Sequence, residues 1–294
     1  MRPMRRPRPY SPTVRRRRLA SELRKLREHA NLTGASAAKA LGWQHSKITR
    51  IETAQQGING PDLQRLLDLY KVENQAVRDG LTQLARDAKH RGWWSDYRDV
   101  FDPGALPDFE AEANLIRTFE PQIVPGLLQT PAYIEAVFRG GAAHAEDVVE
   151  RHVEARMERQ RILEGVHPTR LQAIIDEGAL RRIVGGPEVM AEQLQHLVNM
   201  ATRHNIDIRV LPFSSGAHAG MLGAFVILEF PDPLDPSLAF TESVTSSLFV
   251  EEPHQLERYG DVYGHLQGAA LLPSQSVWFI EQVKSYLEVS GTHE

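Results

Sequence analysis

The sequence predicts a mainly α-helical N-terminal region followed by an α+β C-terminal domain in a chain of 294 residues. Between residues 17 and 90, apolar residues recur every three or four positions, which is the spacing of one helix face. Beyond residue 111, helical patterns alternate with short runs rich in Ile, Val, Leu and Phe, which are typical of β-strands. A chain of this length allows about two domains.

Composition excludes several classes of protein. The chain is 41% hydrophobic and 24% charged, an ordinary globular composition, and it contains no cysteine. A disulfide framework, a thiolate nucleophile and a cysteine-based zinc site are therefore excluded. No run approaches the roughly 18 apolar residues of a membrane span, and no apolar signal-peptide core follows the basic N-terminus. These features predict a cytoplasmic protein that does not enter a membrane.

The net charge of −4 hides an asymmetry between the two ends of the chain. Residues 1–60 carry 14 Lys and Arg but only three acidic residues, so they have a net charge of +11 and the remainder has −15. A basic end on an acidic body is typical of a nucleic-acid-binding module joined to a region that avoids nucleic acid. A basic tail that only aids solubility would give the same asymmetry, so charge alone does not decide between them.

Residues 1–16 are rich in Arg and Pro and lack apolar periodicity, which predicts a disordered basic arm. Such an arm contacts phosphates or enters a minor groove, although a tail with only weak electrostatic attraction fits the sequence equally well. The phosphate contacts are expected from four consecutive arginines, Arg15, Arg16, Arg17 and Arg18.

Five helices are predicted in residues 17–90, and local signals mark their ends. Thr33 is a good N-cap residue for the second helix, and Gly42 suits a tight turn before the third. Pro61 fits the first turn of the fourth helix. The five helices are expected at residues 17–30, 33–41, 44–54, 62–71 and 74–90.

Residues 91–110, with Trp93 and Trp94, are predicted as a linker or docking segment, and residues 111–294 as the α+β domain. Strands are expected at residues 170–175, 206–211, 224–230 and 238–244. Helices are expected at residues 111–119, 130–138, 146–164, 176–184, 187–204, 254–270 and 274–289.

The window Leu32–Glu52, LTGASAAKALGWQHSKITRIE, carries the strongest functional pattern. Ala38 is small enough for two helices to cross closely, and Gly42 makes the turn between them. Ile48 and Ile51 lie three positions apart and fix the next helix against the first two. The outward side of that helix then carries His45, Ser46, Thr49 and Arg50, with Lys47 on its flank.

This arrangement places a helix in the major groove of double-stranded DNA. Arg50 is expected to contact the O6 and N7 atoms of a guanine, and the smaller outward side chains to bond other bases or touch a thymine methyl group. Lys47, Arg27 and the N-terminal arginines are expected to contact phosphates, which gives affinity without sequence choice. A generic helical hairpin with a solvated basic face is the alternative.

Residues 17–72 resemble the xenobiotic-response-element/Cro type of helix-turn-helix, which has a lambda-repressor-like fold, and SKITRIE (Ser46–Glu52) is similar to its recognition helix. The resemblance implies that the helix at about 44–54 reads bases. Gln44 stands where Ser or Thr often caps that helix, and Gly34 stands where a Gln often contacts a phosphate. The missing contact is expected from the backbone N–H of Thr33 or from the basic arm.

Three segments of the acidic region, at residues 119–138, 156–163 and 211–233, resemble the conserved C-terminal domain of a large actinobacterial regulator family. This resemblance spans about residues 92–289, and the excess of Arg over Lys fits a GC-rich genome. It implies a small partner protein encoded nearby, but it assigns no role to individual residues.

Motifs of enzymes are missing from the sequence, which predicts a protein that is not an enzyme and that needs no cofactor or metal. The adjacent carboxylates Asp176 and Glu177 are interpreted as a solvated edge. His218 lies in a small-residue loop and either faces a ligand or only belongs to a turn. Trp93 and Trp94 are interpreted as packing residues rather than as base-stacking residues.

The sequence therefore predicts a transcriptional regulator that binds double-stranded DNA as a homodimer and receives a signal through its C-terminal domain. A small protein partner is slightly favoured as that signal, and a small molecule bound near the strands at 206–244 is the alternative. An autoregulatory DNA-binding head on an enzymatic or toxin-like body, and a pure interaction protein, are the remaining hypotheses.

Overall fold

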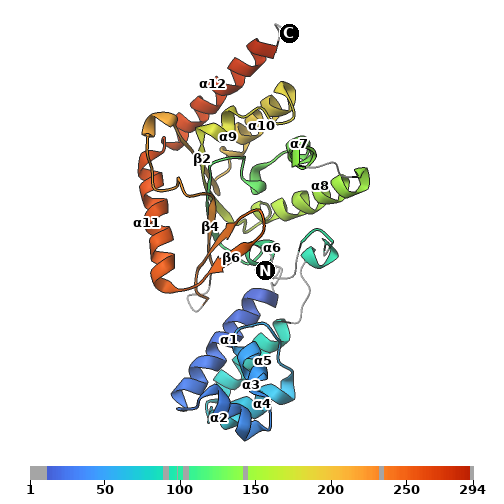
Figure 1. Ribbon diagram of the computed structural model, residues 1–294, viewed down its shortest axis with the longest axis vertical. Coiled ribbons are helices and arrows are strands. Elements are labelled where there is room, and N and C mark those ends of the chain that lie inside the picture. The colour runs from blue at the N-terminus through green and yellow to red at the C-terminus, as the bar shows by residue number, and fades with distance from the viewer. Residues whose placement is uncertain are drawn as a thin grey trace, which may run out of the picture. The chain divides into compact units, whose positions relative to one another are not determined.

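The structure is a computed structural model that describes residues 12–88, 93–97, 99–101, 106–141, 145–231 and 235–291. The chain divides into two compact units, Met1–Glu112 and Ala113–Glu294 (Figure 1). The first unit is helical and the second combines helices with a mixed sheet, which confirms the predicted fold class. In the part of the chain that is described, no helix is long and apolar enough to cross a membrane.

Five α-helices form most of the first unit, and side-chain caps fix where several of them begin. Thr33, Asn59 and Asn74 each accept a hydrogen bond from a backbone N–H in the helix that follows. The helices are α1 (Pro12–His29), α2 (Gly34–Leu41), α3 (His45–Glu52), α4 (Gly60–Leu69) and α5 (Gln75–Asp87).

Helix α1 begins earlier than the sequence analysis predicts. Residues 12–16, assigned to a disordered arm, are helical, because Pro12 suits the first turn of a helix and Val14 is buried with the rest of the apolar face. Residues 1–11 of the predicted arm lie outside the described residues.

One hydrophobic core joins the helices of the first unit. It is built from aliphatic side chains at helical spacing, and their burial holds the short helices α2 and α3 in place. Its most deeply buried members are Leu23, Ala37, Ala38, Ile48, Leu63, Leu66 and Leu67.

The predicted linker belongs to the first unit. It contains a 3₁₀ turn, η1 (Trp93–Tyr97), and a short helix, α6 (Leu106–Glu110). The Trp93 ring meets the rings of Trp94, Tyr97 and Phe101 edge-on, with centroids 5.9 to 6.0 Å apart. These contacts make Trp93 and Trp94 part of an aromatic cluster, as the packing interpretation expects.

The second unit is organised around a six-stranded sheet in the order β3-β2-β1-β4-β5-β6. The pairs β1–β2 and β2–β3 are parallel, and the remaining pairs are antiparallel. The strands are β1 (Leu115–Glu120), β2 (Arg170–Asp176), β3 (Ile206–Leu211), β4 (Phe225–Glu229), β5 (Leu238–Glu242) and β6 (Ser247–Val250).

Two strands correct the sequence analysis. Strand β1 occupies most of the predicted helix at 111–119, because it is a central strand whose apolar residues are buried on both faces, so alternation gives no signal. Strand β6 follows β5 through a hairpin in which Ser243 N–H donates to the Ser246 carbonyl, and this four-residue strand was not predicted.

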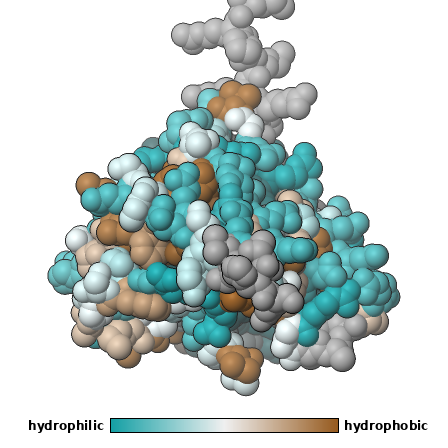
Figure 2. Space-filling model, turned by 90° about the horizontal axis from the view of Figure 1, so that it is seen from above, coloured by the Kyte–Doolittle hydropathy of each residue, from teal (hydrophilic) through white to brown (hydrophobic). Residues whose placement is uncertain are grey.

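Helices cover both faces of the sheet. Helix α11 lies along one face, where Tyr263 and Leu266 pack with Phe119 and Phe225, and α8 lies on the other (Figure 1). On the face drawn in Figure 2, hydrophobic side chains lie in small patches among hydrophilic ones. The helices are α7 (Pro131–Gly141), α8 (Glu146–Gln160), α9 (Glu177–Arg181), α10 (Pro187–Met200), α11 (Pro253–Ala269) and α12 (Pro273–Gly291), with 3₁₀ turns η2 (Gly126–Leu128), η3 (Arg161–Leu163) and η4 (Phe213–Ser215).

Candidate nucleic-acid interface

A tight turn joins α2 to α3. Gly42 adopts a left-handed conformation with φ of 71°, and its N–H donates to the carbonyl of Lys39. A residue with a Cβ atom is disfavoured in this conformation, which explains the glycine that the sequence places here. Gln44 precedes α3 in an extended conformation and makes no side-chain cap, so α3 begins without this stabilisation.

Helix α3 is held to the unit by one face. Ile48 and Ile51 are only 1% and 3% exposed, and they lie in the core formed with α1 and α2. The opposite side of α3 is exposed and polar. It carries the four residues predicted to contact bases, His45, Ser46, Thr49 and Arg50.

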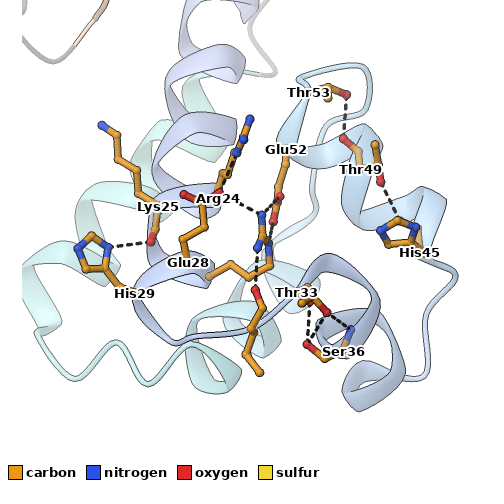
Figure 3. A network of polar contacts seen from close by, with 12 residues as sticks. Arg24, Lys25, Glu28, His29, Thr33, Ser36, His45, Thr49, Glu52 and Thr53 are labelled. Atoms are coloured by element: carbon orange, nitrogen blue, oxygen red, sulfur yellow. Dashed lines mark hydrogen bonds and ion pairs between the residues drawn. The ribbon is translucent and has the colours of Figure 1, made fainter.

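The exposed residues of α3 differ in how they are held. The hydroxyl of Thr49 donates to the carbonyl of His45 within the same helix, at 3.3 Å (Figure 3). Within the described parts of the chain, no hydrogen bond or ion pair engages the Arg50 guanidinium, which therefore extends into solvent with its donors available.

Arg27, which the sequence analysis expects to contact a phosphate, is bound inside the first unit. Its Nε and Nη2 atoms donate to the two carboxylate oxygens of Glu52 at 2.7 and 2.8 Å, and Nη1 donates to the carbonyl of Leu32 at 2.7 Å. The two charged side chains are only 11% and 10% exposed. Hydrogen bonding to Glu52 raises the pKa of Arg27. Arg27 therefore links α1 to α3.

Lys47 also has a partner inside the unit. Its Nζ atom donates to Asp62 of α4 at 2.7 Å and lies 3.7 Å from the centroid of the Trp43 ring. The ion pair and the cation–π contact hold the ammonium group on the flank of α3, where the sequence analysis expects it. Its positive charge is nevertheless already offset by a carboxylate.

The four consecutive arginines are half-buried residues of α1, which corrects their assignment to a free arm. Arg15 Nη1 donates to Asp87 at 2.9 Å, and its Nε atom lies 3.6 Å from Glu112. The Arg17 guanidinium lies 5.0 Å from the centroid of the Phe109 ring, and burial lowers its pKa to about 10. Arg16 and Arg18 share the half-buried environment of this helix.

Thr33 uses its side chain to begin α2. Its Oγ1 atom accepts a hydrogen bond from Ser36 N–H at 3.1 Å, and Ser36 Oγ donates to the Thr33 carbonyl at 2.9 Å (Figure 3). Thr33 itself remains exposed at this helix start.

Two family models match the chain. A model described as a helix-turn-helix domain matches residues 18–81, which include α2, the turn and α3. A model described as a domain of unknown function, DUF5753, matches residues 104–282, more than half of the chain. The chain belongs to the DUF5753 family. No curated protein and no solved structure matches it.

In the DUF5753 domain, the adjacent carboxylates at the end of β2 are structural. Asp176 Oδ1 accepts a hydrogen bond from Gly178 N–H at 2.8 Å, and Glu177 accepts from Arg181 Nε at 2.6 Å and from Phe213 N–H at 2.7 Å. His218 Nε2 lies 3.8 Å from Asp176 Oδ2. Both carboxylates therefore anchor the chain around β2, rather than forming the solvated edge expected from the sequence.

A second polar group of the DUF5753 domain was not found by sequence reasoning. Burial raises the pKa of Glu120 from 4.5 to about 7, and burial lowers the pKa of Arg156 to about 10. Arg156 Nη1 donates to Gln129 Oε1 at 2.7 Å, and Gln160 Nε2 donates to the Gln129 carbonyl at 2.8 Å. These hydrogen bonds join the segments 119–138 and 156–163. No local pattern in the sequence indicates this group, because the hydrogen-bonded residues lie 27 and 31 positions apart.

Metal binding has no support among the described residues. No group of three or more His, Asp or Glu side chains there is arranged to hold a metal ion.

Proposed function

We propose that this DUF5753 protein is a sequence-specific DNA-binding transcriptional regulator of the xenobiotic-response-element/Cro type, with α3 in the major groove. One observation carries the proposal: α3 follows a tight turn, buries Ile48 and Ile51 on one side, and exposes only polar side chains on the other. This is the geometry by which a helix-turn-helix presents its second helix to base edges. The match to a helix-turn-helix domain supports it.

The exposed residues of α3 have the chemistry for direct readout. Arg50 suits a bidentate contact with guanine O6 and N7, because its guanidinium donors are not engaged by other described residues. Ser46 and Thr49 suit hydrogen bonds to base edges or contact with a thymine methyl group. Gln44 and the backbone of Thr33 lie at the starts of α3 and α2, where they suit phosphate contacts.

The DUF5753 domain takes the remaining tasks of the proposal. A single helix-turn-helix buries modest area, so we assign dimerisation to this domain, which places two copies on half-sites about one helical turn apart. The same domain receives the signal, from a small protein partner or, as the second candidate, from a small molecule near β3–β5.

The first test is binding of the full chain to its own upstream DNA and to random DNA at about 150 mM salt. We expect a preference of about a thousandfold for the cognate site. Arg50→Ala is expected to lose about 1–3 kcal/mol on that site and to bind random DNA as the wild type does. Arg86→Ala, which removes an exposed arginine of α5, is the matched control and is expected to keep the preference.

Two results would contradict this proposal. Equal binding of both DNAs by the wild-type chain would remove sequence-specific regulation. An equal loss on cognate and random DNA in Arg50→Ala would show that Arg50 contacts a phosphate instead of a base.

The contribution of the N-terminal arginines is tested by removing residues 2–11, which leaves α1 intact. If Arg2, Arg5, Arg6 and Arg8 bind phosphates, the slope of log affinity against log salt concentration becomes shallower by about 0.9 for each phosphate that is no longer neutralised. An unchanged slope would show that this segment takes no part in binding.

A further inference from the structure

The first residues of α2 and α3 lie against each other. A Cβ atom built on Gly34, the first residue of α2, would lie 3.0 Å from His45 Nε2 and 3.3 Å from His45 Cδ2. The imidazole ring of His45 therefore occupies the space that any other residue at position 34 would use. Figure 3 shows His45 at the start of α3, beside the Thr33–Ser36 start of α2.

The contact is too close for a methyl group unless the ring moves. The same hypothetical Cβ atom would lie 3.8 Å from Ile48 Cγ2, which is an ordinary packing distance, so the two helices themselves have room. The imidazole is the end of a flexible, exposed side chain, whereas Ile48 is buried in the core. A side chain at position 34 would consequently shift the His45 ring by a few tenths of an ångström and leave α2 and α3 in place.

We propose that Gly34 is a specificity-determining position that acts through His45. It lets the imidazole ring lie across the start of α2, and this fixes which ring atoms face the base pair nearest the start of α3. A neutral imidazole has one donor and one acceptor nitrogen, so its orientation decides which base edge it fits. The inference rests on the proposed function, since the N-terminal residues of a recognition helix are those that contact bases.

The test is selection of binding sites from a random DNA library by the full chain, in five versions: wild type, Gly34→Ala, His45→Ala, the double variant and Gly60→Ala. Gly60 is the first residue of α4 and has open space where its Cβ atom would lie, so it is a matched control. We expect Gly34→Ala and His45→Ala to change the base preference at the same position by about fivefold. The double variant should match His45→Ala, and Gly60→Ala should match the wild type.

The experiment separates the possible failures. An unchanged preference in Gly34→Ala, or the same shift whether His45 is present or not, would overturn the inference. Selection of no sequence by the wild-type chain would overturn the proposed function instead. Thermal unfolding of each variant tests whether the helices are retained. We expect that they are in the Gly→Ala variants, because alanine favours a helix more than glycine does.

Discussion

Arg27 and Glu52 form the contact between α1 and α3, which we call the seam. The seam and the outward face of α3 each contain an arginine, and the two arginines have different environments. At the seam, Arg27 binds both carboxylate oxygens of Glu52 and is largely withdrawn from water. On the outward face, Arg50 is exposed and its guanidinium has no partner among the described residues. Charge and closeness to α3 therefore do not distinguish the two arginines. Burial and an internal carboxylate mark Arg27 as a residue that maintains the fold, whereas exposure without such a partner leaves Arg50 available for the proposed DNA contact.

The largest expected effect comes from breaking the seam. Glu52→Ala removes the carboxylate that accepts two hydrogen bonds from the largely buried Arg27, and we expect a loss of about 3 kcal/mol in the free energy of unfolding. Urea denaturation measures it. Glu22→Ala is the control, because Glu22 pairs with Lys25 at an exposed site of α1, and this variant should lose far less stability. Equal losses would show that the seam pair is no stronger than a surface pair.

A smaller effect is expected from a variant that tests whether Arg27 links two helices or contacts a phosphate. Arg27→Lys keeps the positive charge but loses the two-bond geometry with Glu52, and we expect a loss of about 1.5 kcal/mol in stability. Affinity for random DNA, measured where the variant is fully folded, should not change. Weaker binding of random DNA with unchanged stability would return Arg27 to the group of phosphate contacts.

Glu120 extends the comparison to a buried charge of the DUF5753 domain. Its pKa is raised by burial from 4.5 in the unfolded chain to about 7, so between these values the folded state holds a proton that the unfolded chain releases. The free energy of unfolding should therefore fall as the pH rises from about 5 to 7. We expect about 1 kcal/mol, less than the full shift implies, because part of the side chain reaches water.

Denaturation of the wild type and of Glu120→Gln at pH 5 and pH 7 measures this contribution. The glutamine does not titrate, so the pH dependence of its stability should be flatter by that amount. Identical pH dependence in the two proteins would show that Glu120 has an ordinary pKa.

The smallest expected effect concerns Lys47, which is paired with a carboxylate as Arg27 is but is more exposed than Arg27. Asp62→Asn removes the carboxylate that engages it, and we expect affinity for DNA to rise about threefold and the salt slope to steepen by about one. Asp68→Asn makes the same charge change on α4 beside Arg78, and it is the control. If both variants bind DNA with the same affinity, the increase comes from the loss of one negative charge and not from the release of Lys47.

Local signals allowed the sequence to predict the helix-turn-helix. Gly42 and the spacing of Ile48 and Ile51 act over a few residues, and they set the turn and the buried face of α3. The pairing of Arg27 with Glu52 joins residues 25 positions apart on two helices, and no local pattern encodes it. Arg27 was therefore assigned to phosphate on charge alone.

Strands and helix starts were missed for a related reason. In β1, burial on both faces removes the alternation that marks a strand, and the apolar residues also fit a helix. At the start of α1, arginines and prolines resemble a disordered arm, while the contacts of Arg15 and Arg17 with Asp87 and Phe109 involve residues far along the chain. Long-range partners decide these elements.

On α3, the residues that maintain the fold are different from the exposed residues, and this has a consequence for how the sequence can change in evolution. Ile48, Ile51 and Glu52 maintain the fold, whereas Ser46, Thr49 and Arg50 are exposed and exchangeable without cost to it. If α3 reads DNA as proposed, these three positions are free after gene duplication to change one at a time and so to give each copy its own target. His45 is different, because its ring borders closely on Gly34, so a change at one of these two positions alters the surroundings of the other.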